Sequence, residues 1–120
     1  HLRSHQCEII GDVLHHDVIL VDDMIDTGSR VVAAAKACVR AGALRVFCVC
    51  THGLFSGEAA RDLAESPIEQ IIVADTIPLS EEVLEQSSDK IRVVSIAPLL
   101  AEAIRRMQQD QTLSVLESSV

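Results

Sequence analysis

Residues suited to binding a ligand are concentrated in one stretch near the start of this sequence. An apolar run at 18–21 ends in two adjacent carboxylates, Asp22 and Asp23, and a third carboxylate, Asp26, follows closely. A few small residues and an amphipathic segment come next. In open α/β sheets, ligands bind at the carboxyl ends of the strands. This order therefore predicts a buried strand that delivers acidic side chains to a ligand site beside the start of a helix.

The small residues are Thr27, Gly28 and Ser29, and their types suit a phosphate group. Phosphate binds where several main-chain N–H groups converge at a helix N-terminus with no bulky side chain in the way. Gly28 permits a close approach or a positive φ, and the two hydroxyls can donate to an anion or cap the helix. The Gly-Lys-Ser/Thr of a Walker A loop and the Gly-x-Gly-x-x-Gly of a dinucleotide loop are both absent from this stretch.

The adjacent carboxylates of Asp22 and Asp23 repel one another and lose hydration if they are buried. Ribose hydroxyls can donate hydrogen bonds to them, and a divalent cation can neutralise them. Asp26 is within reach of the same site. The combined pattern predicts a phosphorylated sugar as the ligand. The alternative is structural, because aspartate at a strand end and the tripeptide Asp-Thr-Gly also occur in exposed turns.

Composition limits the class of protein. The 120 residues are enough for one compact domain, and a net charge of −8 argues against a nucleic-acid surface. No apolar run approaches the ~20 residues of a membrane span, so we expect a soluble, cytoplasmic protein. Without Trp or Tyr, the core must be aliphatic. We expect the four cysteines to be buried, reduced thiols: Cys7, Cys38, Cys48 and Cys50.

Apolar runs predict an α/β fold, specifically a three-layer sandwich with a mainly parallel, five-stranded sheet. Four of the runs are rich in Val and Ile without apolar–polar alternation, which is typical of strands covered on both faces. Helical patterns lie between them, which indicates βαβ units. The five predicted strands are 7–10, 18–21, 46–50, 71–74 and 91–96.

Helical periodicity is clearest at 31–39, where one apolar stripe ends shortly before Gly42. The last helical segment begins at Pro98, which suits a first turn, and we expect its apolar residues, Leu99, Leu100, Ala103, Ile104 and Met107, to point inward. Residues 110–120 have no strong pattern, and the polar residues 1–6 are expected to be a cut end or linker. The predicted helices are 31–39, 59–64, 81–86 and 98–107.

The aspartate-rich loop resembles the phosphoribosyl-diphosphate (PRPP) binding loop of type I phosphoribosyltransferases and of ribose-phosphate diphosphokinases (PRPP synthetases). Further segments are similar, in the same order, to the C-terminal half of the second family: 10–13, 51–57, 75–78 and 100–106. The resemblance implies a phosphoribosyltransferase-like fold over 7–120. It also implies that an N-terminal half, which carries the ATP side, is absent from this sequence.

The resemblance further implies a reaction in which ATP and ribose 5-phosphate give PRPP and AMP with Mg²⁺. No catalytic residue is assigned to this chain, ATP would bind mainly through the absent half, and we expect the chain to be inactive alone. Self-association into a homo-oligomer is also implied. Metal ligands stay open, with Asp22 and Asp23 contacting Mg²⁺ only through the substrate. By the same resemblance, Asp22 and Asp23 hold the ribose hydroxyls, and the phosphate cradle comprises Asp26, Thr27, Gly28 and Ser29.

The loop departs from the family at its phosphate end. Family members usually have Asp-Thr, a small residue and then Gly-Thr, whereas here Gly28, Ser29 and Arg30 follow Asp26-Thr27 directly. In one alignment the loop is one residue shorter and Ser29 replaces the threonine; in the other Arg30 stands in its place. We favour the shorter loop, because it keeps a hydroxyl and the helix register. Arg30 remains a candidate substrate or regulatory contact.

Two residues outside the loop are further candidates. His52 follows the third predicted strand at the same sheet edge and could contact substrate, although a buried structural histidine hydrogen-bonded to a neighbouring turn is the alternative. Ser114 lies in a region that contributes to a regulatory site in some family members. Other functions also stay open: a non-catalytic, PRPP-synthetase-associated regulatory subunit, or a type I phosphoribosyltransferase that binds PRPP.

Overall fold

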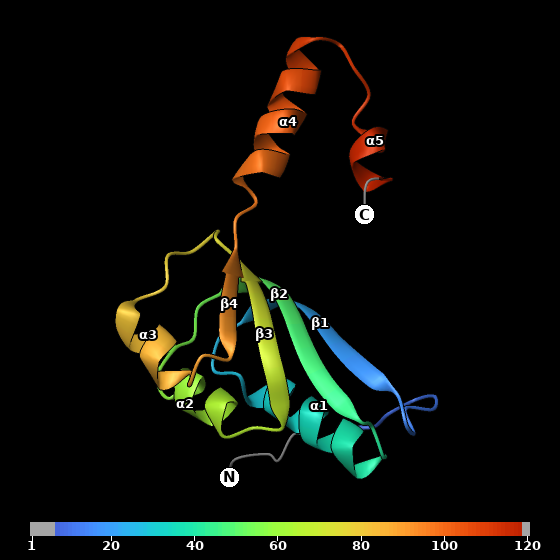
Figure 1. Ribbon diagram of the computed structural model, residues 1–120, viewed down its shortest axis with the longest axis vertical. Helices are drawn as coiled ribbons and strands as arrows, with labels where there is room; N and C mark the ends of the chain where they lie inside the picture. The colour runs from blue at the N-terminus through green and yellow to red at the C-terminus, as the bar shows by residue number, and fades with distance from the viewer. Residues whose placement is uncertain (1–6, 119–120) are drawn as a thin grey trace.

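A parallel sheet forms the centre of the computed structural model, which describes residues 7–118 (Figure 1). Its strands lie in the order β1-β2-β3-β4, and every neighbouring pair is parallel. The expected cut end or linker, residues 1–6, lies outside the described residues. The strands are β1 (Asp17–Ile25), β2 (Arg45–Gly53), β3 (Ile68–Ala74) and β4 (Ile91–Val94).

The prediction of five strands is wrong for the described residues, where the sheet has four. Residues 7–10 were expected to form the first strand, but they have no regular secondary structure. Ile10 is 97% exposed, so this apolar run contributes little to the core. A run of four residues gains a strand conformation only where a neighbouring edge pairs with it, and β1 has no second neighbour in the described sheet.

Three helices cover one face of the sheet, and each connects two neighbouring strands (Figure 1). The longest packs through a stripe of small apolar residues, Val31, Ala35 and Cys38, that allows a close approach to the strands. On that face the central strands bury Cys48 and Ile71 completely. These helices are α1 (Ser29–Arg40), α2 (Ala59–Ala64) and α3 (Glu81–Gln86).

The opposite face of the sheet has no covering layer among the described residues, so the predicted third layer is not seen. Val21 is 80% exposed and Ile19 is 61% exposed on β1, whereas Val18 and Leu20 pack against the core. The strand order explains this difference. Each crossover moves to the next strand in the same direction, and crossovers of one hand then place their helices on the same face.

The last two helices, α4 (Ala97–Gln108) and α5 (Ser114–Glu117), extend away from the sheet (Figure 1). The radius of gyration is 16.8 Å, above the roughly 14 Å of a compact domain of this length. The helical pattern at 98–107 is confirmed, but its inward orientation is wrong, because Leu99, Leu100, Ile104 and Met107 are all more than half exposed. Periodicity identifies an apolar helix face but does not supply the surface that buries it.

Three of the cysteines, Cys38, Cys48 and Cys50, are buried free thiols as expected, whereas Cys7 is exposed. Burial raises the pKa of the Cys48 thiol to about 12, with the neighbouring Cys50 and Asp22 adding to the effect. Over the part of the chain that is described, no helix has both the length and the apolar character that a membrane span requires.

Candidate functional site

The candidate site is the loop between β1 and α1, at the carboxyl edge of the sheet. β1 is longer than predicted and continues to Ile25, so Asp22 lies within the strand, paired with Cys50, rather than after it. Main-chain hydrogen bonds hold the end of this strand: Leu54 N donates to Ile25 O (2.8 Å), and Ser56 N donates to Asp26 O (3.1 Å). The segment after β2 therefore fixes where the loop begins.

Gly28 makes the turn from the loop into α1. It has a φ of 77°, in the left-handed region that favours glycine, and it is buried. A Cβ atom built on Gly28 would lie 3.4 Å from the side chain of Leu63, which is fully buried on α2. The loop thus rests on the second helix, and a side chain at this position would meet backbone strain and van der Waals contact with Leu63.

The start of α1 presents N–H groups that have no protein acceptor. The first helical hydrogen bond runs from Val32 N to Gly28 O (2.9 Å). Among the described residues, no acceptor faces the N–H groups of Ser29, Arg30 and Val31. Neither hydroxyl of the loop caps the helix; instead the Oγ1 of Thr27 and the Oγ of Ser29 lie 3.1 Å apart. The helix N-terminus therefore offers several donors to an external acceptor.

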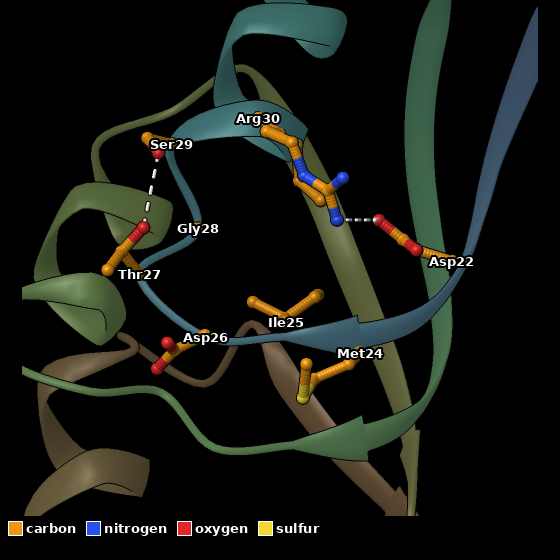
Figure 2. Close-up of a pocket in the computed structure, with 9 residues that line it drawn as sticks. Asp22, Met24, Ile25, Asp26, Thr27, Gly28, Ser29 and Arg30 are labelled. Atoms are coloured by element: carbon orange, nitrogen blue, oxygen red, sulfur yellow. Dashed lines mark hydrogen bonds and ion pairs between the residues drawn. The ribbon is translucent and has the colours of Figure 1, made fainter.

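A cavity of about 80 Å³ opens between this loop and β1 (Figure 2). It is lined by main-chain and side-chain atoms of one continuous segment, and Figure 2 shows the side chain of Arg30 reaching toward Asp22, with Thr27 and Ser29 across from them. The structure thus brings most of the predicted loop residues together around one space. The lining residues are Asp22, Met24, Ile25, Asp26, Thr27, Gly28, Ser29, Arg30 and Val31.

Asp22 is the carboxylate that faces this space from the sheet. Its Oδ1 accepts a hydrogen bond from the main-chain N–H of Asp23 (2.9 Å). Hydrogen bonding to Asp23 is the main cause that holds the pKa of Asp22 below its usual value, and the positive charge of Arg30 and the N–H of Met24 act in the same direction. The side chain is therefore ionised at neutral pH and acts as an acceptor for hydroxyl groups.

The other two predicted carboxylates differ in position. Asp26 lines the cavity but is exposed, whereas Asp23 is exposed and is not among the residues that line it. The prediction that these carboxylates share one cavity is thus met by Asp22 and Asp26. Asp23 lies beside it and contributes chiefly through its contact with Asp22.

Arg30 reaches from the first turn of α1 across to Asp22. Its Nη2 lies 3.4 Å from Oδ2 of Asp22, and the two side chains are 71% and 30% exposed. The sequence singled out Arg30 only as a departure from a family pattern. This ion pair joins residues eight apart in the chain, and no local sequence signal predicts such a contact.

His52 lies one strand away, opposite Met24 in the β1–β2 register. It is exposed, so the expectation of a buried histidine is wrong, but the expected hydrogen bond to a neighbouring segment is present. Its Nδ1 lies 2.7 Å from Oγ1 of Thr76, which follows β3 and whose hydroxyl donates to Thr51 O (3.2 Å). Thr76 lies in the family-like segment 75–78, but its contact with His52 joins residues 24 apart, which no local pattern predicts.

Ser114 does not belong to this cavity. It is the first residue of α5, and its Oγ lies 2.8 Å from Oγ1 of Thr112. Figure 1 shows α5 well away from the loop between β1 and α1.

The described residues contain no group of three or more His, Cys, Asp or Glu side chains placed to hold a metal ion. Mg²⁺ commonly binds through one or two carboxylates together with the phosphates of a substrate. The donor set of Asp22 and its neighbour Asp23 fits that second mode.

A parallel α/β sheet with open N–H donors and a carboxylate at its carboxyl edge is the arrangement of domains that bind anionic ligands at that edge. Residues 4–117 match the profile of the family described as the phosphoribosyl synthetase-associated domain. The chain therefore belongs to this family.

Relatives are named ribose-phosphate pyrophosphokinase. The Haemophilus influenzae relative is 50% identical over 90% of this chain and 34% of its own length. The Haemophilus ducreyi relative is 48% identical over 94% of this chain and 35% of its own length. The Aquifex aeolicus relative is 47% identical over 95% of this chain and 35% of its own. This chain thus spans about a third of the length of these relatives.

A solved structure also shares the fold. The crystal structure of phosphoribosylpyrophosphate synthetase from Mycobacterium smegmatis is 39% identical and superposes with a TM-score of 0.75. The match covers 84% of this chain and 33% of that one.

Proposed function

We propose that this chain is the ribose 5-phosphate-binding part, in the C-terminal half, of a ribose-phosphate diphosphokinase that converts ATP and ribose 5-phosphate into PRPP and AMP. The observation that carries the proposal is the cavity in which open N–H donors at the start of α1 face the carboxylate of Asp22. The names and similarity of the relatives support the same enzyme.

The phosphate of the sugar binds at the start of α1. The N–H groups of Ser29, Arg30 and Val31 donate to it, and the hydroxyls of Thr27 and Ser29 add further donors. The partial positive charge of a helix N-terminus favours an anion at this point. α1 has 12 residues, long enough for a full helix dipole.

The ribose hydroxyls donate to Asp22, which lines the cavity, and the main-chain N–H of the adjacent Asp23 donates to the same carboxylate. An ionised carboxylate accepts such bonds well, because charge-assisted hydrogen bonds are stronger than neutral ones. Asp22 and Asp23 are the residues that would hold Mg²⁺, together with phosphate groups of the substrate or product. The ion would supply positive charge that offsets the negative charge of the transferred diphosphoryl group.

The remaining part of the parent protein covers the open face of the sheet and supplies the ATP side. Support comes from the exposed apolar side chains of that face, such as Val21, and from the exposed apolar side of α4. Exposed apolar surface of this extent is typical of an interaction site. On this proposal the chain alone is inactive, and the assembled enzyme is a cytoplasmic homo-oligomer.

The open face can be tested separately in the intact protein. Val21→Arg is expected to lower the free energy of unfolding or to disrupt assembly, because it places a charge in a covered surface. Val39→Arg is the matched control, since Val39 lies on the outer side of α1 and is 46% exposed. Equal behaviour of the two variants would show that the sheet face is not covered.

Activity is tested by following AMP formation from ATP and ribose 5-phosphate in the intact protein, together with calorimetric titration of ribose 5-phosphate. Asp22→Asn is expected to weaken sugar binding by far more than it alters stability. Asp89→Asn is a matched control, because Asp89 is exposed and its positive φ of 62° is one that asparagine tolerates. No binding of ribose 5-phosphate by the unsubstituted protein would refute the proposal.

A regulatory, non-catalytic subunit is a second candidate, and one observation favours it. Arg30 already neutralises Asp22 in the cavity, which a purely hydroxyl-binding carboxylate does not need. Binding of ribose 5-phosphate without AMP formation by the intact protein would support this second function. Consumption of PRPP with a nucleobase, in place of AMP formation, would instead indicate a type I phosphoribosyltransferase.

A further inference from the structure

The cavity between β1 and α1 has an unfavourable charge for the ligand proposed above. Two carboxylates, Asp22 and Asp26, line it, and either one repels a phosphate dianion. Arg30 is the one cationic side chain among the described residues that line this space. Main-chain N–H groups are dipoles and do not cancel two full charges, so the side chain of Arg30 has a specific part in admitting an anion.

In the structure Arg30 is paired with Asp22, but the pair is loose. The separation of 3.4 Å is long for a charge-assisted hydrogen bond, and the guanidinium is 71% exposed. Ion pairs of this kind contribute little to stability and exchange readily with competing ions. Nothing in the packing of α1 therefore fixes Arg30 on Asp22.

The guanidinium also has room to move toward the start of the helix. Arg30 lines the cavity at the loop and, on its other side, a second one of about 280 Å³ that Leu20 and Ala34 help to form. Figure 2 shows its side chain extending from the first turn of α1 toward Asp22, with Ser29 the preceding residue of the same turn. The planar guanidinium of arginine can bind two phosphate oxygens at once. Its pair with Asp22 uses a single contact, from Nη2 to Oδ2 at 3.4 Å.

We propose that Arg30 changes partner when ligand binds: it pairs with Asp22 in the free protein and with the phosphate of the sugar in the complex. The exchange leaves Asp22 available to accept the ribose hydroxyls. It makes the site select phosphorylated sugars over free ones, since only a phosphate draws Arg30 away from Asp22. This inference rests on the proposed function, because it assigns a selective residue to the same cavity.

The test is calorimetric titration of the intact protein with ribose 5-phosphate and with ribose. Arg30→Gln is expected to weaken ribose 5-phosphate binding about 10- to 100-fold, the usual effect of losing a charge-assisted contact. Ribose binding is expected to stay unchanged or to tighten, because Asp22 no longer has a competing partner. Arg30→Lys keeps the positive charge but lacks the planar guanidinium. Its affinity for ribose 5-phosphate should lie between those of the unsubstituted protein and Arg30→Gln.

Arg40→Gln is the matched control, since it removes the same charge from the last turn of the same helix. It should leave both titrations unchanged. A direct readout of the exchange is the carboxyl ¹³C resonance of Asp22 during titration with inorganic phosphate. The resonance should move in the unsubstituted protein and stay still in Arg30→Gln.

The outcomes separate the two proposals. Equal ribose 5-phosphate affinity in Arg30→Gln and the unsubstituted protein overturns the exchange and leaves the proposed function standing. Equal losses in Arg30→Gln and Arg40→Gln also overturn it, since they show a long-range charge effect. No binding by the unsubstituted protein overturns the proposed function and the exchange together. If Arg30→Gln fails to fold, Arg30→Lys replaces it in the test. The exchange is then overturned by two results together: unchanged ribose 5-phosphate affinity in Arg30→Lys, and an Asp22 carboxyl resonance that does not move in the unsubstituted protein.

Discussion

The Nδ1 atom of His52 lies 2.7 Å from the hydroxyl of Thr76, joining the carboxyl ends of β2 and β3. The same hydroxyl donates its only hydrogen to Thr51 O (3.2 Å). Thr76 must therefore accept from His52, which places the proton of the neutral ring on Nδ1. The Nε2 atom is left as an unprotonated acceptor on the exposed edge, one strand from the candidate cavity.

Replacing Thr76 by valine should remove the hydrogen bond that favours the Nδ1-protonated tautomer of His52. We expect the neutral ring of His52 to shift toward the Nε2-protonated form, because Nδ1 loses its acceptor while the shape of residue 76 is nearly kept. The ¹⁵N shifts of the imidazole report the change. Thr76→Ser, which keeps the hydroxyl, is the control and should match the unsubstituted protein. An Nε2-protonated ring in that protein would contradict the assignment.

Gly28→Ala should destabilise the loop. A residue with a Cβ at a φ of 77° costs about 1–2 kcal/mol, and here the new atom would also contact Leu63. Urea denaturation should show a lower free energy of unfolding, and titration should show weaker ribose 5-phosphate binding. Gly28→Asn should lose less stability, since asparagine tolerates this region. An alanine variant as stable as the glycine protein would mean that the turn is not constrained.

Glu102 should titrate well below other glutamates. Its hydrogen bonds to Arg105, followed by those to Arg106, lower its pKa from 4.5 to about 2. A depressed carboxyl pKa stabilises the folded form above the unfolded value, so this contribution is complete above pH 4.5 and is lost as the pH falls toward 2. The carboxyl ¹³C resonance of Glu102 gives the midpoint directly. In Arg105→Gln the midpoint should move up toward 4.5, and a midpoint already near 4.5 in the unsubstituted protein would exclude the pairing.

Thiol reagents should distinguish the four cysteines. Cys7 is exposed and should react first, whereas Cys48 has a pKa of about 12 and is fully buried. At pH 8 a pKa of about 12 leaves about one thiolate in ten thousand, and the thiolate is the reactive form. Labelling followed by peptide mass analysis should place the slow sites at Cys38, Cys48 and Cys50. Cys7→Ser should remove the fast phase, and rapid labelling of Cys48 would mean that the core opens.

The elements of this fold were largely predictable because their signals are local. The stripe at 31–39 became α1 (Ser29–Arg40), and the β-branched run at 71–74 lies within β3 (Ile68–Ala74). The loop was predictable for the same reason, since its small residues stand directly between an apolar run and a helical stripe. The strand prediction for residues 7–10 was wrong because strand formation depends on a neighbouring edge. A run of four residues does not encode that edge.

The site contacts were less predictable because they depend on distances between elements. Asp22 and Asp23 look equivalent in the sequence, yet only Asp22 lines the cavity. The pairing of Arg30 with Asp22 and the support of Gly28 by Leu63 both join different elements. Likewise, the periodicity of α4 revealed its apolar face, but the sequence held no information about which surface lies against it.

The order of the strands has a consequence for how the chain is made. Within residues 7–118, each later strand pairs with the strand that precedes it in the sequence, and none is inserted between two earlier ones. A ribosome releases the chain from its N-terminus at about 5–20 residues per second, which is slow compared with local folding. β1 and β2 can therefore pair before β3 has been synthesised, and every later strand adds to an edge that already exists. Synthesis and folding can proceed in the same direction, without rearrangement of any strand already in place.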